Sequence, residues 1–228
     1  MELNGIRAVL FDLDDTLYSR REAAKMTFYG MFREHLYPTA SDELIHDAVE
    51  YMMSKVERNS MISERAFSAL LEKFSPEIPY DRPRCVDYYY EHIVEFAELF
   101  SEQMELIKVL RAAGIKTAIV TNIPEARVYA QKAKIDALGL REVVDAVVIS
   151  GEIGIHKPDP HIYLYACNQL GVMPEECIFV GDDPDSDVKG ALASGMEAVW
   201  LDAIGTEDPF AGDRRVHRVA SVREYFKF

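Results

Sequence analysis

Short apolar runs alternate along the chain with longer segments in which apolar residues recur at helical spacing. The clearest runs lie at Ala8–Asp12, Lys116–Thr121, Ala146–Ser150, Cys177–Val180 and Ala198–Leu201, with a weaker one near Arg218–Ala220. Runs of this length, bounded by polar or turn-forming residues, are typical of strands buried on both faces of a parallel sheet. The alternation predicts an α/β fold, a Rossmann-like doubly wound parallel sheet with helices on both faces.

Turn and cap residues give the limits of the predicted helices. Ser101 is expected to cap a helix that runs to Ala113, and Gly114 suits the left-handed end of that helix. Pro124 is placed in the first turn of a helix that continues to about Leu138. Further helices are predicted from Pro160 to near Gly171 and from Asp185 to Ser194.

Between the first two apolar runs, from Arg20 to about Leu99, the pattern is helical and rich in Met, Phe and Tyr. This segment is too long for a simple crossover between neighbouring strands. It predicts an inserted all-helical cap domain, residues 19–98, with a catalytic core formed by 1–18 and 99–228. An insertion at that edge of the sheet would lie over the ligand site and act as a lid. The alternative is an extended helical layer of the same domain.

Composition excludes several classes of protein. A net charge of −14, without a cluster of Lys and Arg, argues against a nucleic-acid partner. No apolar run approaches the roughly 18 residues of a membrane span, and no secretion signal is expected. Three cysteines without C-x-x-C spacing indicate reduced thiols in a cytoplasmic protein and argue against a zinc site. If so acidic a protein binds phosphate esters, a metal ion and a few basic side chains must supply local positive charge.

Two carboxylates, Asp12 and Asp14, follow directly on the first predicted strand. The carboxyl ends of parallel strands are where open α/β sheets bind ligands. Two acids crowded there repel each other unless a cation or a shared proton separates them. The arrangement suits a magnesium-dependent phosphoryl transfer in which one aspartate attacks phosphorus and the other moves a proton. The alternative is that these acids only cap the next helix or a turn.

A second group of acids, Asp182, Asp183, Asp185 and Asp187, follows the fourth predicted strand. So many carboxylates in one short segment need a cation or solvent to coexist. Mg²⁺ prefers hard oxygen ligands and is commonly held by one or two carboxylates together with waters. The segment is therefore a candidate magnesium site, with an acidic surface loop as the alternative.

Two more polar features follow the predicted strands. The second strand ends in Thr121 and Asn122, whose hydroxyl and backbone N–H groups can hold phosphate oxygens. Lys157 is followed by two prolines, Pro158 and Pro160, which fix the loop and start the next helix. A rigid loop can aim one lysine at the carboxyl edge of the sheet, where its charge offsets that of Asp12 and of a phosphoryl group.

These residues together resemble the motifs of one family, the haloacid dehalogenase-like hydrolase superfamily. Four motifs match in order: Asp12-x-Asp14-x-Thr16, then Thr121, then Lys157 in Lys157-Pro158-Asp159-Pro160, then Gly181-Asp182 with Asp187 following. The chain is similar to the phosphatase branch, which has a helical cap inserted after the first motif. Each motif is weak singly, but four in order on the expected strands and loops make a specific signal.

The resemblance implies a role for each motif residue. Asp12 would be the nucleophile that forms an aspartyl-phosphate. Asp14 would protonate the leaving alkoxide and then deprotonate the water that hydrolyses the intermediate. Thr121 and the Asn122 amide would bind the phosphoryl oxygens, and Lys157 would orient Asp12 and neutralise the group in transit.

The resemblance also implies a magnesium ion and its ligands. The ion would be held by the Asp12 carboxylate, the Asp14 backbone carbonyl and the Asp182 carboxylate. Asp187 would act through a bound water, and Asp183 is the alternative ligand. The expected substrate is a small phosphorylated metabolite of the sugar phosphate, nucleoside monophosphate or phosphoglycolate type, with no nucleic-acid or membrane partner.

Other activities stay open at the level of sequence. The branch of the family that cleaves carbon–halogen bonds lacks an acid at the position of Asp14, so a phosphatase is favoured over a dehalogenase. A phosphomutase needs the same four motifs. A non-catalytic binding protein is the alternative from another class, but it would not need all these charges. Arg20 and Arg21 are candidates to recognise a second anionic group of the substrate, or are simply solvated residues at the start of a helix.

Overall fold

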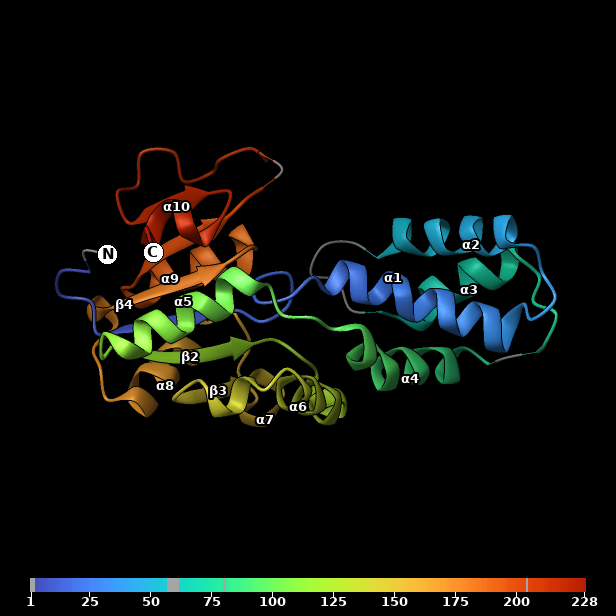
Figure 1. The fold of residues 1–228 in the computed structure, drawn as a ribbon, viewed down its shortest axis with the longest axis horizontal. Coiled ribbons are helices and arrows are strands. Elements are labelled where there is room, and N and C mark those ends of the chain that lie inside the picture. The colour runs from blue at the N-terminus through green and yellow to red at the C-terminus, as the bar shows by residue number, and fades with distance from the viewer. Residues whose placement is uncertain (1–2, 57–61, 80, 204) are drawn as a thin grey trace. The chain divides into compact units, whose positions relative to one another are not determined.

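The computed structural model describes residues 3–56, 62–79, 81–203 and 205–228. Within these residues, six strands form one parallel sheet in the order β3-β2-β1-β4-β5-β6 (Figure 1). The strands are β1 (Ala8–Phe11), β2 (Lys116–Thr121), β3 (Ala146–Ile149), β4 (Cys177–Gly181), β5 (Glu197–Leu201) and β6 (Val216–Val219). The predicted doubly wound parallel sheet is confirmed.

β1 occupies the centre of the sheet, and all four of its residues are buried. Phe11, the last residue of β1, is in register with Ile119 of β2 on one side and Val180 of β4 on the other. The segments that follow these three strands therefore leave the sheet side by side at its carboxyl edge. Asp12 is held there by its own N–H group, which donates to the Val180 carbonyl over 2.9 Å.

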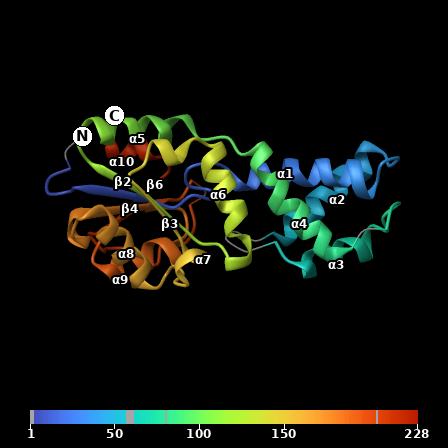
Figure 2. The same cartoon turned by 90° about the horizontal axis from the view of Figure 1, so that it is seen from below.

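Helices cover both faces of the sheet. They are α5 (Ser101–Ala112), α6 (Val128–Ala137), α7 (Ser150–Ile153), α8 (Pro160–Leu170), α9 (Lys189–Ser194) and α10 (Val222–Phe226). α5 and α10 pack together on one face, and α8 and α9 pack together on the other (Figure 2). Tyr163 of α8, Phe179 of β4 and Trp200 of β5 are buried together in one core cluster.

Three predicted helix starts differ from those observed. Ser101 does not cap α5: it is the first helical residue and Phe100 occupies the N-cap position. The N–H group of Phe100 donates to the Leu17 carbonyl over 2.9 Å, which keeps Phe100 extended and lets the helix begin after it. Pro124 is likewise extended and precedes a 3₁₀ turn, Glu125–Arg127, so α6 begins only at Val128. The helix predicted to begin at Asp185 starts instead with a π-helical turn, Pro184–Val188, and α9 begins only at Lys189.

The chain divides into two compact units, residues 1–19 with 98–228 and residues 20–97. The second unit contains α1 (Arg20–Met31), α2 (Asp42–Lys55), α3 (Glu64–Lys73) and α4 (Arg82–His92) and is called the helical unit below. It has its own aromatic core, in which Phe28 stacks on Phe32 and Tyr89 and meets the edge of Phe67. None of the described helices has the length and apolar character that crossing a membrane requires.

Candidate active site

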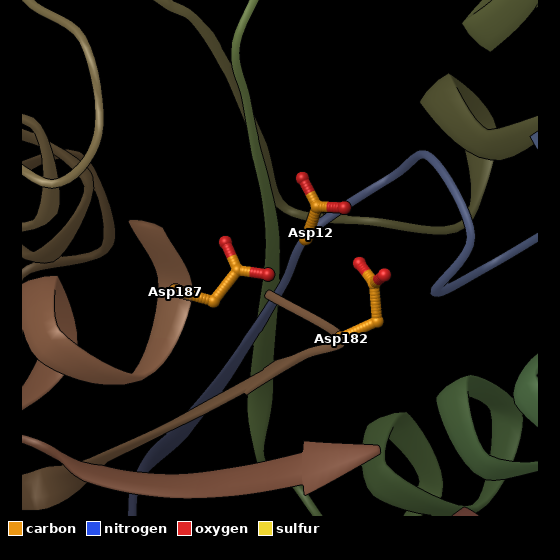
Figure 3. Close-up of side chains that lie close together, drawn as sticks. All are labelled: Asp12, Asp182 and Asp187. Carbon is orange, nitrogen blue, oxygen red and sulfur yellow. The ribbon is translucent and has the colours of Figure 1, made fainter. Parts of the chain in front are cut away.

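Three buried carboxyl groups gather at the carboxyl edge of the sheet. Asp12 follows β1, Asp182 follows β4 and Asp187 lies in the π-helical turn, and carboxylate oxygens of all three lie within 4.8 Å of one another (Figure 3). The exposed fractions of these residues are 6%, 5% and 1%. Trp200 fixes the backbone at this point, because its indole N–H donates to the Asp182 carbonyl over 3.0 Å.

Lys157 is the basic side chain that joins two of these carboxylates. Its ammonium group donates to Asp12 Oδ1 over 2.6 Å and to Asp187 Oδ1 over 2.7 Å, and its side chain is only 3% exposed. Asn122 holds the lysine loop from the end of β2. The Asn122 side chain donates to the Lys157 carbonyl and accepts from the Lys157 N–H, both over 2.9 Å. The structure thus brings together four residues predicted from separate motifs.

The charges in this cluster do not balance. Burial raises the pKa of Asp12 to about 7; the Lys157 ammonium opposes that rise, and the carboxylates of Asp187 and Asp14 add to it. Burial alone would lower the pKa of Lys157, but the neighbouring Asp12 and Asp187 outweigh it and raise that pKa above its ordinary value. Lys157 therefore stays charged, and the acids around it retain an excess of negative charge that a cation would relieve.

Gly181, the last residue of β4, makes room for Asp187. A Cβ atom at this position would lie 2.2 Å from Asp187 Oδ2 and 2.6 Å from Asp187 Cβ, both far inside van der Waals contact. The close approach puts the Asp187 carboxylate against the end of β4, where Oδ2 also accepts from the Asp183 N–H over 3.1 Å. Glycine at 181 is thus required by the position of Asp187.

Replacing Gly181 with alanine is expected to displace Asp187 and break its contact with Lys157. Because the clash is with a residue fixed by its own turn, we expect a loss of stability of about 1–3 kcal/mol, the range for an overpacked core. Thermal unfolding and Mg²⁺ titration of the variant check this. Gly30→Ala is the control for glycine loss, because its φ lies outside the left-handed region and a Cβ there would meet only the Tyr88 hydroxyl at 3.7 Å, an ordinary contact. If Gly181→Ala binds Mg²⁺ as tightly as the unaltered protein does, the view that Gly181 is needed to place Asp187 in the candidate magnesium site is contradicted.

Asp14 lies in a second group of side chains beside the first. Lys134 Nζ donates to Asp14 Oδ1 over 2.8 Å, and Gln131 Nε2 donates to Asp14 Oδ2 over 2.9 Å. The Tyr18 hydroxyl donates to Asp14 Oδ1. Gln131 Nε2 is also 2.6 Å from Thr121 Oγ1, so one amide joins Asp14 to the residue predicted to hold phosphate. We call these five side chains the Asp14 network.

The remaining predicted residues are Asp183, Arg20 and Arg21. The Asp183 carboxylate caps the π-helical turn, accepting from the Asp185 N–H and the Ser186 hydroxyl, and it is not part of the three-carboxylate cluster. Arg20 and Arg21 begin α1 in the helical unit. The hydrogen bond that Lys25 donates to Glu50 in α2 lowers the pKa of that carboxyl group, and the charge of Arg21 adds a smaller effect in the same direction.

Sequence reasoning missed Gln131 and Lys134. The buried residues of α6 are Ala130, Gln131, Lys134 and Ile135, so two of the four that face inward are polar. Their i, i+3 spacing puts both on one face of the helix. The sequence gives no clear signal for this pair, because the apolar residues of α6 do not gather on one face of the helix and neither polar residue stands out among them.

A doubly wound parallel sheet with buried acids and a lysine at its carboxyl edge is typical of α/β proteins that bind ligands at that edge. The family model of the haloacid dehalogenase-like (HAD) hydrolases matches the sequence over residues 6–195, so the chain belongs to this family. It is 34% identical to a glyceraldehyde 3-phosphate phosphatase of Methanopyrus kandleri over 86% of this chain and 84% of that protein. It is 30% identical to a phosphoserine phosphatase of Thermus thermophilus over 97% and 98% of the two chains.

A solved structure supports the fold. A HAD phosphatase from Thermococcus onnurineus superimposes with a TM-score of 0.65 at 26% identity, and the match covers 97% of both chains. The predicted family is therefore confirmed. The predicted enzyme class, a phosphoric monoester hydrolase, is confirmed as well, since both curated relatives belong to it.

Proposed function

We propose that the protein is a Mg²⁺-dependent phosphatase that hydrolyses a small phosphorylated metabolite through an aspartyl-phosphate intermediate. The observation that carries the proposal is the buried Asp12 carboxylate, 2.6 Å from the Lys157 ammonium and grouped with Asp182 and Asp187. A carboxylate held in this way is oriented by the lysine, and positive charge is available for a phosphoryl group that reaches it.

The residues present fit a magnesium ion. Three buried carboxyl groups with oxygens within 4.8 Å, against one ammonium, offer hard oxygen ligands and an excess of negative charge. Asp12, Asp182 and the Asp14 backbone carbonyl would hold the ion. Asp187 suits a role through water, because its oxygens already accept from Lys157 and the Asp183 N–H group. When bound, the ion supplies positive charge that stabilises the transferring phosphoryl group.

The chain's own residues carry the chemical steps. An oxygen of Asp12 forms a bond to phosphorus while the bond from phosphorus to the leaving oxygen breaks, and that oxygen takes the proton of Asp14. Water then attacks the same phosphorus, giving its proton to Asp14, and the phosphorus–oxygen bond to Asp12 breaks to release phosphate. Thr121 Oγ1 and the Asn122 N–H hold the phosphoryl oxygens, and Lys157 keeps Asp12 in place.

We assign substrate choice to the helical insertion, residues 19–98, acting as a cap. Arg20 and Arg21 at the start of α1 are the proposed contacts to a second anionic group, which guanidinium groups bind bidentately. The relatives support a sugar phosphate or a phosphorylated small acid, since the two named above act on glyceraldehyde 3-phosphate and phosphoserine. An acidic protein of this kind is proposed to act on free metabolites in the cytoplasm.

Phosphate release from a panel of phosphorylated metabolites tests the proposal. We expect release with Mg²⁺ and a loss of roughly 10²-fold or more with EDTA, because the cluster then lacks its counter-charge. Mg²⁺ at 100 times its Kd is also expected to stabilise the fold by about 2.7 kcal/mol. Asp182→Asn should lose both effects, whereas Asp185→Asn, on a side chain 77% exposed, should keep them. Metal-independent release, or none from any substrate, would contradict the proposal.

A further inference from the structure

The inner face of α6 presents a buried lysine and glutamine whose contacts converge on one carboxylate. Gln131 is 1% exposed and Lys134 is 5% exposed, and both donate to Asp14. Lys134 Nζ also donates to Gln131 Oε1 over 3.1 Å and lies 5.1 Å from the centre of the Tyr18 ring. Asp14 is therefore held on both of its oxygens, by an ammonium and a hydroxyl on one and an amide on the other.

Stability is a poor reason for this arrangement. The Lys134 side chain is 6% exposed and that of Asp14 is 18% exposed, so forming this ion pair costs desolvation that the attraction repays only in part. Such a pair is weak evidence for stabilisation. Well-packed apolar residues on α6 would fill the same space at no such cost. What Lys134 and Gln131 do supply is a fixed orientation of Asp14, because two donors on different oxygens prevent the carboxyl group from turning.

We propose that Gln131 and Lys134 are positioning residues that hold Asp14 in register with Thr121 for proton transfer. The amide of Gln131 carries the link, since its Nε2 is 2.9 Å from Asp14 Oδ2 and 2.6 Å from Thr121 Oγ1. The proton donor to the leaving group is thereby tied to the hydroxyl that holds the phosphoryl oxygens. This inference rests on the proposed function, in which Asp14 protonates the leaving oxygen.

Leaving groups of different basicity separate positioning from a structural role. A phenolate must be protonated as it departs, whereas p-nitrophenolate departs with far less need of a proton. Loss of a well-placed acid therefore slows phenyl phosphate much more than p-nitrophenyl phosphate. The ratio kcat/KM is the quantity to compare, because it covers the steps up to departure of the leaving group.

The variants are Lys134→Met and Gln131→Met, with Lys132→Met as the control. Lys132 lies on the same helix, but its side chain is 46% exposed and paired with Glu152. For both Asp14 network variants we expect kcat/KM to fall roughly 10- to 100-fold with phenyl phosphate and less than about 3-fold with p-nitrophenyl phosphate. Lys132→Met is expected to leave both values unchanged. Lys134→Met removes a charge beside Asp14 as well as a contact, whereas Gln131→Met removes only the contact. Gln131→Met therefore decides whether orientation is what matters, including when Lys134→Met fails to fold.

Equal losses on the two substrates in folded variants would overturn the inference and leave α6 with a structural role. The unaltered protein distinguishes this from failure of the proposed function. If it releases phosphate from neither ester with Mg²⁺ present, the phosphatase assignment itself falls, and the positioning role falls with it. Thermal unfolding of each variant shows that the comparison is made between folded proteins.

Discussion

Replacing Asp12 with asparagine is expected to abolish phosphate release, with a loss of roughly 10⁴-fold or more in kcat, as when a nucleophile is removed. Asparagine has nearly the same shape and can still accept from Lys157 Nζ, which is 2.6 Å from Asp12 Oδ1. It cannot supply the carboxylate oxygen that is proposed to form the bond to phosphorus. The measurement is phosphate release by the purified variant on the best substrate of the unaltered protein.

The control is Asp136→Asn, which removes a carboxylate from an exposed residue of the same unit. Its turnover is expected to be unchanged. Because asparagine at 12 removes a buried charge without creating a cavity, the variant should unfold at a temperature close to that of the unaltered protein. A folded Asp12→Asn protein that keeps a tenth or more of its activity would exclude Asp12 as the nucleophile.

Replacing Lys157 with methionine is expected to abolish phosphate release and to lower the free energy of unfolding. Asp12 and Asp187 then face each other without the ammonium group that bridges them over 2.6 and 2.7 Å. Breaking a buried ion pair by removing one partner costs about 3–5 kcal/mol, because it leaves an uncompensated buried charge. We expect a loss of that size in denaturant unfolding without metal, and a smaller one with saturating Mg²⁺, which restores positive charge to the cluster.

Lys189→Met is the matched control, since it also breaks a lysine–aspartate pair but on side chains that are 54% and 77% exposed. Surface pairs of this kind contribute about 0–1 kcal/mol. The two variants together test whether burial, rather than ion pairing as such, makes Lys157 important. Unfolding of Lys157→Met at the same denaturant concentration as the control would show that the cluster does not depend on this lysine.

The strands were predictable because burial on both faces leaves a clear pattern in the sequence. Lys116–Thr121 was predicted with the limits that β2 has in the structure. Helix starts were less predictable, because a cap depends on the path of the chain before it. Ser101 has the composition of a cap, yet a hydrogen bond from Phe100 to Leu17 moves the helix start by one residue. That contact joins segments far apart in the sequence, so no local pattern could show it.

The site was predictable where its residues follow strands and unpredictable where they act through helices. Asp12 and Asp182 follow neighbouring strands, so the sheet order alone brings them together. Spacing could not separate Asp183 from Asp187, because a π-helical turn decides which carboxylate faces the cluster. From the sequence alone, Lys134 would be taken for an ordinary solvated residue of a helix. Only its burial and its contact with Asp14 reveal it.

The sheet order also governs when the site can exist during synthesis. β1 is made first, but its partners are Lys116–Ile119 of β2 and Cys177–Val180 of β4. The strand that leads into Asp12 therefore leaves the ribosome about 100 residues before β2, a wait of roughly 5–20 s at about 5–20 residues per second. The insertion adds little to the entropy of closing the sheet, since that cost grows only with the logarithm of loop length. A nascent chain that stops before β2 holds Asp12, the proposed nucleophile, but lacks Thr121, Lys157 and Asp182, which all come later in the sequence.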